Sequence, residues 1–204
     1  RNNGNKRMNI NEIKKEFPIF DDKIQNNDLV YLDSANSSQK PRVVVDRIYD
    51  FYTKEFSNVG RSVHYLAVAA TNLYEITRTS VQKYINASDR NEIVFTKGAT
   101  EAINLVANTF GQKYLSEGDE VLLTELEHHS NYVPWHFLRK AKNIKIEFAE
   151  INDNGEVTLE AIEKKITNKT KIISVSHLSN VTGAILPIKE IVQLAHSKNI
   201  PVLI

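Results

Sequence analysis

From residue 91 to the end of the chain, short apolar runs alternate with stretches whose apolar residues recur at helical spacing. This alternation indicates a mostly parallel sheet with helices on both faces, and thus an α/β domain over residues 91–204. The expected strands cover residues 92–96, 120–125, 144–151, 171–176 and 201–204, and the expected helices lie near 100–115, 131–142, 158–166 and 187–198.

The preceding residues, 9–90, predict a segment that is mainly helical. The expected elements are a short helix at 9–17, an extended piece at 29–32, an amphipathic helix from Pro41 to Phe56 and a second helix ending near Asn86. Residues 1–8 are polar apart from the only methionine, so we expect them to be disordered, as foreign residues or as the tail of a leader.

Composition excludes several classes of protein. The 26 basic and 25 acidic residues leave a net charge of +1, without the basic stripe of a protein that tracks phosphate backbones, so we expect no nucleic-acid partner. No window approaches the ~18 uninterrupted apolar residues of a membrane span, and the N-terminus lacks the apolar core of a secretory signal. We expect a cytoplasmic protein, with an organelle stroma as the alternative.

The chain has no cysteine, which excludes disulfides, thiolate metal sites and a thiol nucleophile among these residues. It stops within the apolar run at residues 200–204, with no turn or polar tail after it. Because natural domains rarely end within a strand, we expect the α/β domain to be incomplete.

Polar clusters follow three of the expected strands: KGATE at 97–101, EHHSN at 127–131 and HLSNVTG at 177–183. In an open parallel sheet, ligands bind in the crevice outside the carboxyl ends of the strands. We therefore expect the three clusters to share one edge of the sheet.

The first cluster has the features of an anion site. Gly98 would let the backbone turn closely, and Ala99 and Thr100 open a helix whose first amides are free. A phosphate fits such a terminus, with about 0.3–1 kcal/mol of help from the helix dipole. The spacing of a Walker loop is absent. The alternative is that Thr100 only caps the helix.

The second cluster contains His128 and His129, which could be a metal pair, an acid/base or stacking residue with its neighbour, or two surface histidines. Adjacent side chains diverge and no second ligand motif completes a zinc site, so we expect no metal. An imidazole exchanges protons near neutral pH, and its flat face can lie on an aromatic ligand. This reasoning leaves a functional role and simple surface exposure equally open. Trp135 is expected to pack in the helix core.

In the third cluster, the amide of Asn180 can donate to a phenolate or carboxylate oxygen, in a loop that Gly183 lets bend back. The alternative is an ordinary turn. Arg61 and His64 lie in an earlier loop, where a solvated arginine is the default interpretation.

Four segments carry a resemblance in this order: YLDSANSSQKP, FTKGATEAINLVAN, ELEHHSNYVPW and VSHLSNVTGAILPI. Together they resemble the N-terminal half of the SUF-type cysteine desulfurases, a group that includes selenocysteine lyases within the class V aminotransferases. The resemblance runs from about Ile10 to the last residue. It implies the large α/β domain of a fold type I transferase that depends on pyridoxal 5′-phosphate (PLP).

The resemblance implies an enzyme that removes sulfur from L-cysteine, leaving L-alanine and an enzyme persulfide for iron–sulfur cluster assembly. It also implies a sulfur-acceptor protein of the SUF system and a homodimer at full length. In the family pattern, His128 stacks on the cofactor ring and assists proton transfer, with His129 as a structural neighbour. Ala99 and Thr100 match the turn that holds the cofactor phosphate. Asn180 matches a residue near the cofactor's phenolic oxygen and the substrate carboxylate.

Arg61 matches an arginine of the family to which we assign substrate binding. Gly60 stands where many relatives have a histidine, and Asn36 where a second alanine is usual, so substrate preference stays open. The family's cofactor-binding lysine, pyridinium-pairing aspartate and catalytic cysteine are expected beyond Ile204. We therefore expect the 204-residue chain to be inactive by itself. The alternatives are another class V lyase, such as a kynureninase-like enzyme, and a naturally truncated, non-catalytic binding or regulatory protein.

Overall fold

The computed structural model describes residues 9–204, which form two compact units divided between Val94 and Phe95. The expectation of disorder at residues 1–8 lies outside the described residues.

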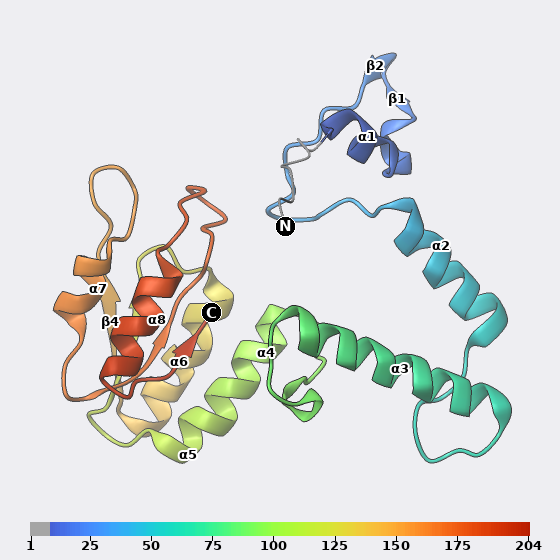
Figure 1. The fold of residues 1–204 in the computed structure, drawn as a ribbon. Helices are drawn as coiled ribbons and strands as arrows, with labels where there is room; N and C mark the ends of the chain where they lie inside the picture. Colours follow the sequence, from blue (N-terminus) through green and yellow to red (C-terminus); the bar gives the residue numbers. More distant parts are fainter. Residues whose placement is uncertain (1–8) are drawn as a thin grey trace, which may run out of the picture. The chain divides into compact units, whose positions relative to one another are not determined.

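The first unit is mainly helical (Figure 1). Its elements are α1 (Ile10–Lys15), the 3-10 turn η1 (Pro18–Phe20), β1 (Lys23–Ile24), β2 (Asn27–Asp28), α2 (Arg42–Asp50), the π-helical turn η2 (Phe51–Glu55), α3 (Tyr65–Tyr84) and the 3-10 turn η3 (Arg90–Glu92). Side chains cap two of these helices: the carbonyl oxygen of the Asn9 side chain accepts from the Asn11 amide, and His64 Nδ1 accepts from the Ala67 amide. Both caps satisfy amides that lack an intrahelical partner.

The extended piece expected at residues 29–32 is not a strand. An antiparallel hairpin forms just before it, where β1 pairs with β2 through the two-residue turn Gln25–Asn26. Both turn residues have positive φ, 53° and 66°, as a tight turn whose twist matches the flanking strands requires. This hairpin was not expected from the sequence, because a glutamine at the first turn position is a weak turn signal.

The strand expected at residues 92–96 is also wrong. Glu92 ends η3, and residues 93–96 are not part of the sheet. The backbone of Ile93 is used locally instead. Its amide donates to the Arg90 carbonyl at 3.1 Å, and its own carbonyl accepts from the Arg78 guanidinium of α3. An apolar run becomes a strand only where a neighbouring strand takes up its backbone groups.

The second unit contains a four-stranded parallel sheet in the order β4-β3-β5-β6. Its elements are α4 (Ala99–Val106), the π-helical turn η4 (Ala107–Gly111), α5 (Gln112–Tyr114), β3 (Glu120–Thr124), α6 (His129–Lys142), β4 (Lys145–Ala149), α7 (Leu159–Lys165), β5 (Thr170–Ser174), α8 (Ile188–Ser197) and β6 (Val202–Leu203). The other four expected strands and all four expected helices of this part of the chain are therefore confirmed, with boundaries shifted by a few residues.

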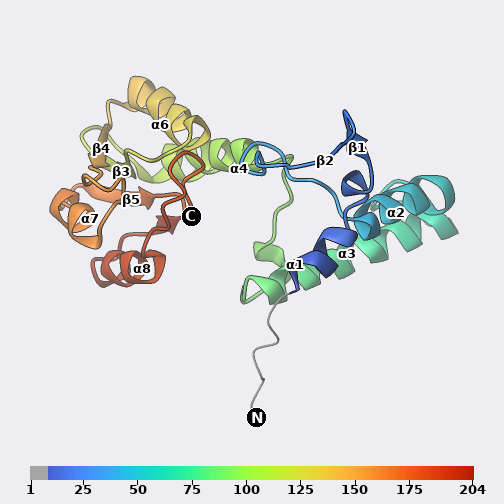
Figure 2. The same ribbon diagram turned by 90° about the horizontal axis from the view of Figure 1, so that it is seen from above.

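Helices cover both faces of this sheet, as Figure 2 shows with α6 on one side and α7 and α8 on the other. Side chains of β3 alternate between the two faces. Val121 and Leu123 pack in a cluster with Trp135 and Leu138 of α6, whereas Leu122 packs with side chains of α7 and α8. All five residues of β3 are buried, and the three central ones, Val121–Leu123, form a continuous apolar run in the sequence.

The helical stretch of α4, η4 and α5 lies against α6 at Gly111. A Cβ built at this glycine would lie 2.6 Å from Cδ2 of Leu138 and 3.6 Å from Cζ3 of Trp135. The absence of a side chain at this position therefore allows the two helices to approach closely. No helix among residues 9–204 combines the length and the apolar character that crossing a membrane requires.

Candidate active site

The loop that follows β3 carries the histidine pair. His128 is the N-cap of α6, and its Nδ1 accepts a hydrogen bond from the Ser130 amide at 3.2 Å. Ser130 Oγ also lies 3.0 Å from this nitrogen. The neighbouring ring of His129, in the first turn of the helix, is inclined at 78° to that of His128. Both histidines are exposed, so the ring faces of His128 are accessible to a ligand.

Behind the histidines lies a network of polar side chains that sequence analysis did not identify. Glu127 accepts hydrogen bonds from Thr124 at the end of β3, from Asn131 in α6 and from Ser176 after β5. Trp135 is fully buried, and its Nε1 donates to Asn131 at 3.2 Å, so its expected packing role is confirmed. The sequence signal for this network is a glutamate, Glu127, followed four residues later by an asparagine, Asn131, at the start of a helix.

The first cluster, KGATE, forms the start of α4. Gly98 is its N-cap, and no side chain caps the helix. The amides of Ala99 and Thr100 occupy the first turn, and both residues are exposed. Glu101 faces backward, since its Oε2 accepts from the Lys97 amide at 2.6 Å. The prediction that the Thr100 side chain caps the helix is not supported, because the cap position belongs to Gly98.

The expected role of Gly98 in a close turn is wrong. Its φ of 162° is extended backbone that any residue adopts, and an added Cβ would meet nothing within 4 Å. The glycine instead leaves open space next to the uncapped amides of α4. The first amides of α4 thus have no side-chain cap, and the space beside Gly98 is open.

The third cluster, HLSNVTG, forms a turn after β5. Ser179 is buried, and its Oγ accepts from the amides of Val181 and Thr182 at 3.2 Å each. The turn closes where Leu178 and Ile185 form an isolated antiparallel bridge. This arrangement places Asn180 at the exposed tip of the turn. Gly183 has a φ of 74°, as expected for a residue that lets the loop bend back.

The second and third clusters follow neighbouring parallel strands, whereas the first begins a helix that no sheet strand precedes. In Figure 1, α4 and α6 run side by side, and the two helices are in contact. The strands β3 and β5, which precede the loops of His128 and Asn180, are neighbours in the sheet. His128 and Asn180 therefore lie at the carboxyl edge of one parallel sheet, and Ala99 and Thr100 begin a helix that packs against α6.

Arg61 belongs to the first unit, outside the unit that contains the sheet. It is exposed, and its φ of 31° is unusual for a residue with a side chain. The preceding Gly60 has a φ of 84°, and its amide donates to Thr71 Oγ1 of α3 at 3.0 Å. The bond to α3 fixes this tight turn, and the role of Arg61 stays a prediction.

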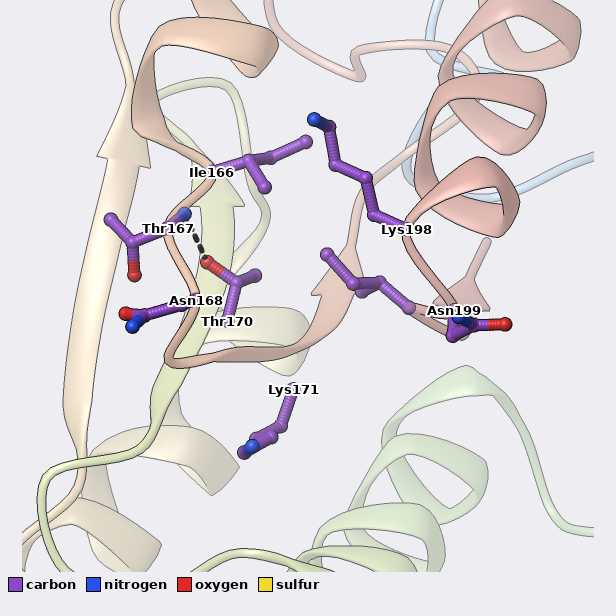
Figure 3. Close-up of a pocket in the computed structure, with 8 residues that line it drawn as sticks. Ile166, Thr167, Asn168, Thr170, Lys171, Lys198 and Asn199 are labelled. Carbon is purple, nitrogen blue, oxygen red and sulfur yellow. Dashed lines mark hydrogen bonds between the residues drawn. The ribbon is translucent and has the colours of Figure 1, made fainter.

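A cavity of about 440 Å³ lies at the opposite edge of the sheet, at the start of β5 (Figure 3). Lys171 and Lys198 line it, and the Thr167 amide donates to Thr170 Oγ1 across its wall at 2.9 Å. Lys171 already lies 3.7 Å from the carboxylate of Asp119. This cavity contains none of the predicted site residues. Within residues 9–204, no three histidine or carboxylate side chains gather closely enough to hold a metal ion.

The chain belongs to the class-V aminotransferase family, which it matches over residues 30–204. It is 46% identical over 189 residues to a protein of Halalkalibacterium halodurans named "Probable cysteine desulfurase", with 93% of this chain and 47% of that protein covered. It is 41% identical over 197 residues to a cysteine desulfurase of Synechococcus elongatus, covering 97% of this chain and 32% of that protein.

The fold matches solved structures of the same kind. The apo structure of a cysteine desulfurase from Thermococcus onnurineus superposes with a TM-score of 0.84 and 35% sequence identity, over 94% of this chain and 46% of that one. The fold is thus that of the large α/β domain of fold type I transferases. The chain spans about half the length or less of the curated relatives it matches. Enzymes of this family depend in general on PLP.

Proposed function

We propose that the full-length protein is a PLP-dependent cysteine desulfurase, which removes sulfur from L-cysteine and leaves L-alanine and an enzyme persulfide. The observation that carries the proposal is that the exposed His128 and Asn180 follow neighbouring strands of the parallel sheet, and that the helix with the uncapped start, α4, packs against α6. The similarity to proteins named cysteine desulfurases supports the choice of substrate.

The first turn of α4 has the chemistry of a phosphate site. Its first amides lack a side-chain cap, and the space beside Gly98 is open, so the phosphate of PLP would be held by the amides and by the Thr100 hydroxyl. The helix dipole adds about 0.3–1 kcal/mol to the binding of such an anion. When bound, PLP would supply an electron sink that stabilises negative charge on the substrate α-carbon, the carbon next to the amino nitrogen.

The proposed roles of the other site residues follow from the polar groups that each of them can offer to a ligand. Because Nδ1 of His128 is occupied as the cap of α6, its Nε2 and its ring faces stay available to stack on the cofactor and to move a proton. The Asn180 amide can donate to the cofactor's phenolic oxygen or to the substrate carboxylate. For Arg61 we propose binding of the substrate carboxylate, which suits a guanidinium.

The biological setting is part of the same proposal. We expect the persulfide sulfur to pass to an acceptor protein of the SUF system for iron–sulfur cluster assembly, and the full-length protein to be a homodimer. A cytoplasmic location also stays a prediction, and the choice between cysteine and selenocysteine is left open.

An assay of substrate choice tests the proposal. The purified full-length protein, supplied with PLP and a reductant, is expected to form L-alanine and sulfide in equal amounts from L-cysteine. L-kynurenine serves as the comparison substrate, because a kynureninase-like lyase would release alanine from it instead. Turnover of kynurenine without turnover of cysteine would exclude the desulfurase, and selenocysteine in a third reaction tests the related lyase activity.

A further inference from the structure

Glu127 accepts hydrogen bonds with both oxygens of its carboxylate. Oε1 accepts from Thr124 Oγ1 at 2.6 Å and from the Ser176 amide at 3.0 Å. Oε2 accepts from Ser176 Oγ at 2.7 Å and from Asn131 Nδ2 at 2.8 Å. A carboxylate offers about four acceptor positions, so these bonds use its full capacity.

The partners of Glu127 are themselves held firmly. Asn131 is 6% exposed, and its Oδ1 accepts from Ser174 Oγ at 2.5 Å and from Trp135 Nε1 at 3.2 Å. Ser174 and Trp135 are fully buried. Thr124, also buried, closes the turn after β3 by accepting from the Leu126 amide at 3.2 Å. The network therefore rests on the packed core of the second unit.

Glu127 lies at the base of both loops that carry proposed site residues. His128 follows it directly, and the His128 carbonyl accepts from the Asn131 amide at 2.8 Å. On the other side, Ser176 immediately precedes His177, whose carbonyl accepts from the Leu186 amide at 3.0 Å and closes the base of the second loop. One carboxylate thus connects the start of the His128 loop to the start of the Asn180 loop.

We propose that Glu127 is a positioning residue that holds the His128 loop and the Asn180 loop at a fixed separation, so that both side chains meet one ligand. The identity of that ligand rests on the proposed function, whereas the connection between the loops does not. Such a connection matters because site groups must be held within roughly 0.5 Å of their working positions.

Glu127→Gln tests the proposal. Glutamine has nearly the same shape as glutamate, but its NH2 group would face at least one of the groups that now donate a hydrogen bond to the carboxylate. Glu125→Gln is the matched control. Glu125 lies in the same loop, but its Oε2 accepts from the Ile151 amide at 2.9 Å, on the side of β4. Hydrogen–deuterium exchange of the full-length protein without added cofactor measures the loops directly.

In Glu127→Gln, amide exchange is expected to rise about 10-fold or more in peptides covering residues 126–131 and 175–183, the factor that corresponds to about 1.4 kcal/mol. In Glu125→Gln, residues 175–183 should exchange as in the wild type. Ser176→Ala is a milder second variant, and it should raise exchange in 126–131 by a smaller factor. Unchanged exchange at 175–183 in Glu127→Gln, or the same rise in both glutamine variants, would overturn the proposal.

Kinetics of the PLP-loaded protein supply the second test. If Glu127 acts through His128, Glu127→Gln lowers kcat about 10-fold or more with less change in KM, and the double variant with His128→Ala is little slower than His128→Ala alone. Independent, multiplicative losses would contradict the positioning role. If the wild type does not turn over cysteine, the proposed function fails, while the exchange experiment still decides whether Glu127 connects the loops.

Discussion

His128 Nδ1 accepts a hydrogen bond from the Ser130 amide at 3.2 Å, which makes the imidazole the cap of α6. Because an N–H group donates to Nδ1, the neutral ring carries its proton on Nε2. The cap therefore selects the tautomer of the exposed ring. The His128 side chain thus caps α6 and, in the proposed function, also takes part in proton transfer. Two substitutions can separate these two roles.

His128→Ala is expected to lower kcat by about 10²-fold or more, the usual range for loss of an acid/base group. It should also destabilise the protein by about 1 kcal/mol, because the cap is lost. His128→Asn restores a good capping residue without the imidazole, so it should recover stability but not kcat. His129→Ala should have the smaller kinetic effect. Steady-state kinetics and urea unfolding measure the two effects, and wild-type turnover in His128→Ala would end the assignment.

Thr100→Val keeps the shape of the side chain and removes its hydroxyl. If this hydroxyl donates to the cofactor phosphate, the free energy of PLP binding should weaken by about 1–3 kcal/mol. Thr109→Val is a control in the same helical stretch, since Thr109 Oγ1 donates to the Leu105 carbonyl at 2.6 Å. Fluorescence titration gives both dissociation constants. An unchanged constant for Thr100→Val would place the phosphate elsewhere.

Gly111→Ala should destabilise the second unit, although alanine is the better helix former. The added Cβ would meet Leu138 Cδ2 at 2.6 Å, and overpacking of a core costs about 1–3 kcal/mol, more than the ~1 kcal/mol that helix propensity returns. Leu138→Ala removes the clashing atom. Urea unfolding of both single variants and of the double variant should therefore show that Gly111→Ala costs less in the Leu138→Ala background, and additive costs would contradict the close contact.

The pKa of His136 in α6 is lowered, chiefly because partial burial disfavours the charged ring, and further by the positive charges of Arg139 and Lys140. Between the lowered pKa of the folded state and the ordinary value of about 6.5, the unfolded chain binds more protons. Stability should therefore fall as the pH drops from about 7 through this window. His136→Gln should remove that part of the pH dependence, and Arg139→Gln should reduce it. Urea unfolding at several pH values measures the slope, and an unchanged slope in His136→Gln would contradict the assignment.

The positions of two candidate site residues were predictable, because these residues follow strands of a parallel sheet. His128 and Asn180 follow the neighbouring strands β3 and β5, and the strand pattern alone assigned both to the carboxyl edge. Glu127 could not be assigned in this way. Its partner Ser176 lies 49 residues away in the sequence, and this contact exists only because β3 and β5 pair.

Helices and strands that depend on a short stretch of residues could be predicted from the sequence pattern of that stretch. The apolar run at 121–123 and the helical spacing of the segments around it are properties of short stretches, and they determined an α/β unit from the sequence alone. The tertiary structure decided what depends on distant partners. Residues 92–96 have the pattern of a strand, but the backbone of Ile93 bonds to Arg90 and to Arg78 of α3 instead. Backbone groups must be satisfied wherever partners are available, and no local pattern says which distant segment will supply them.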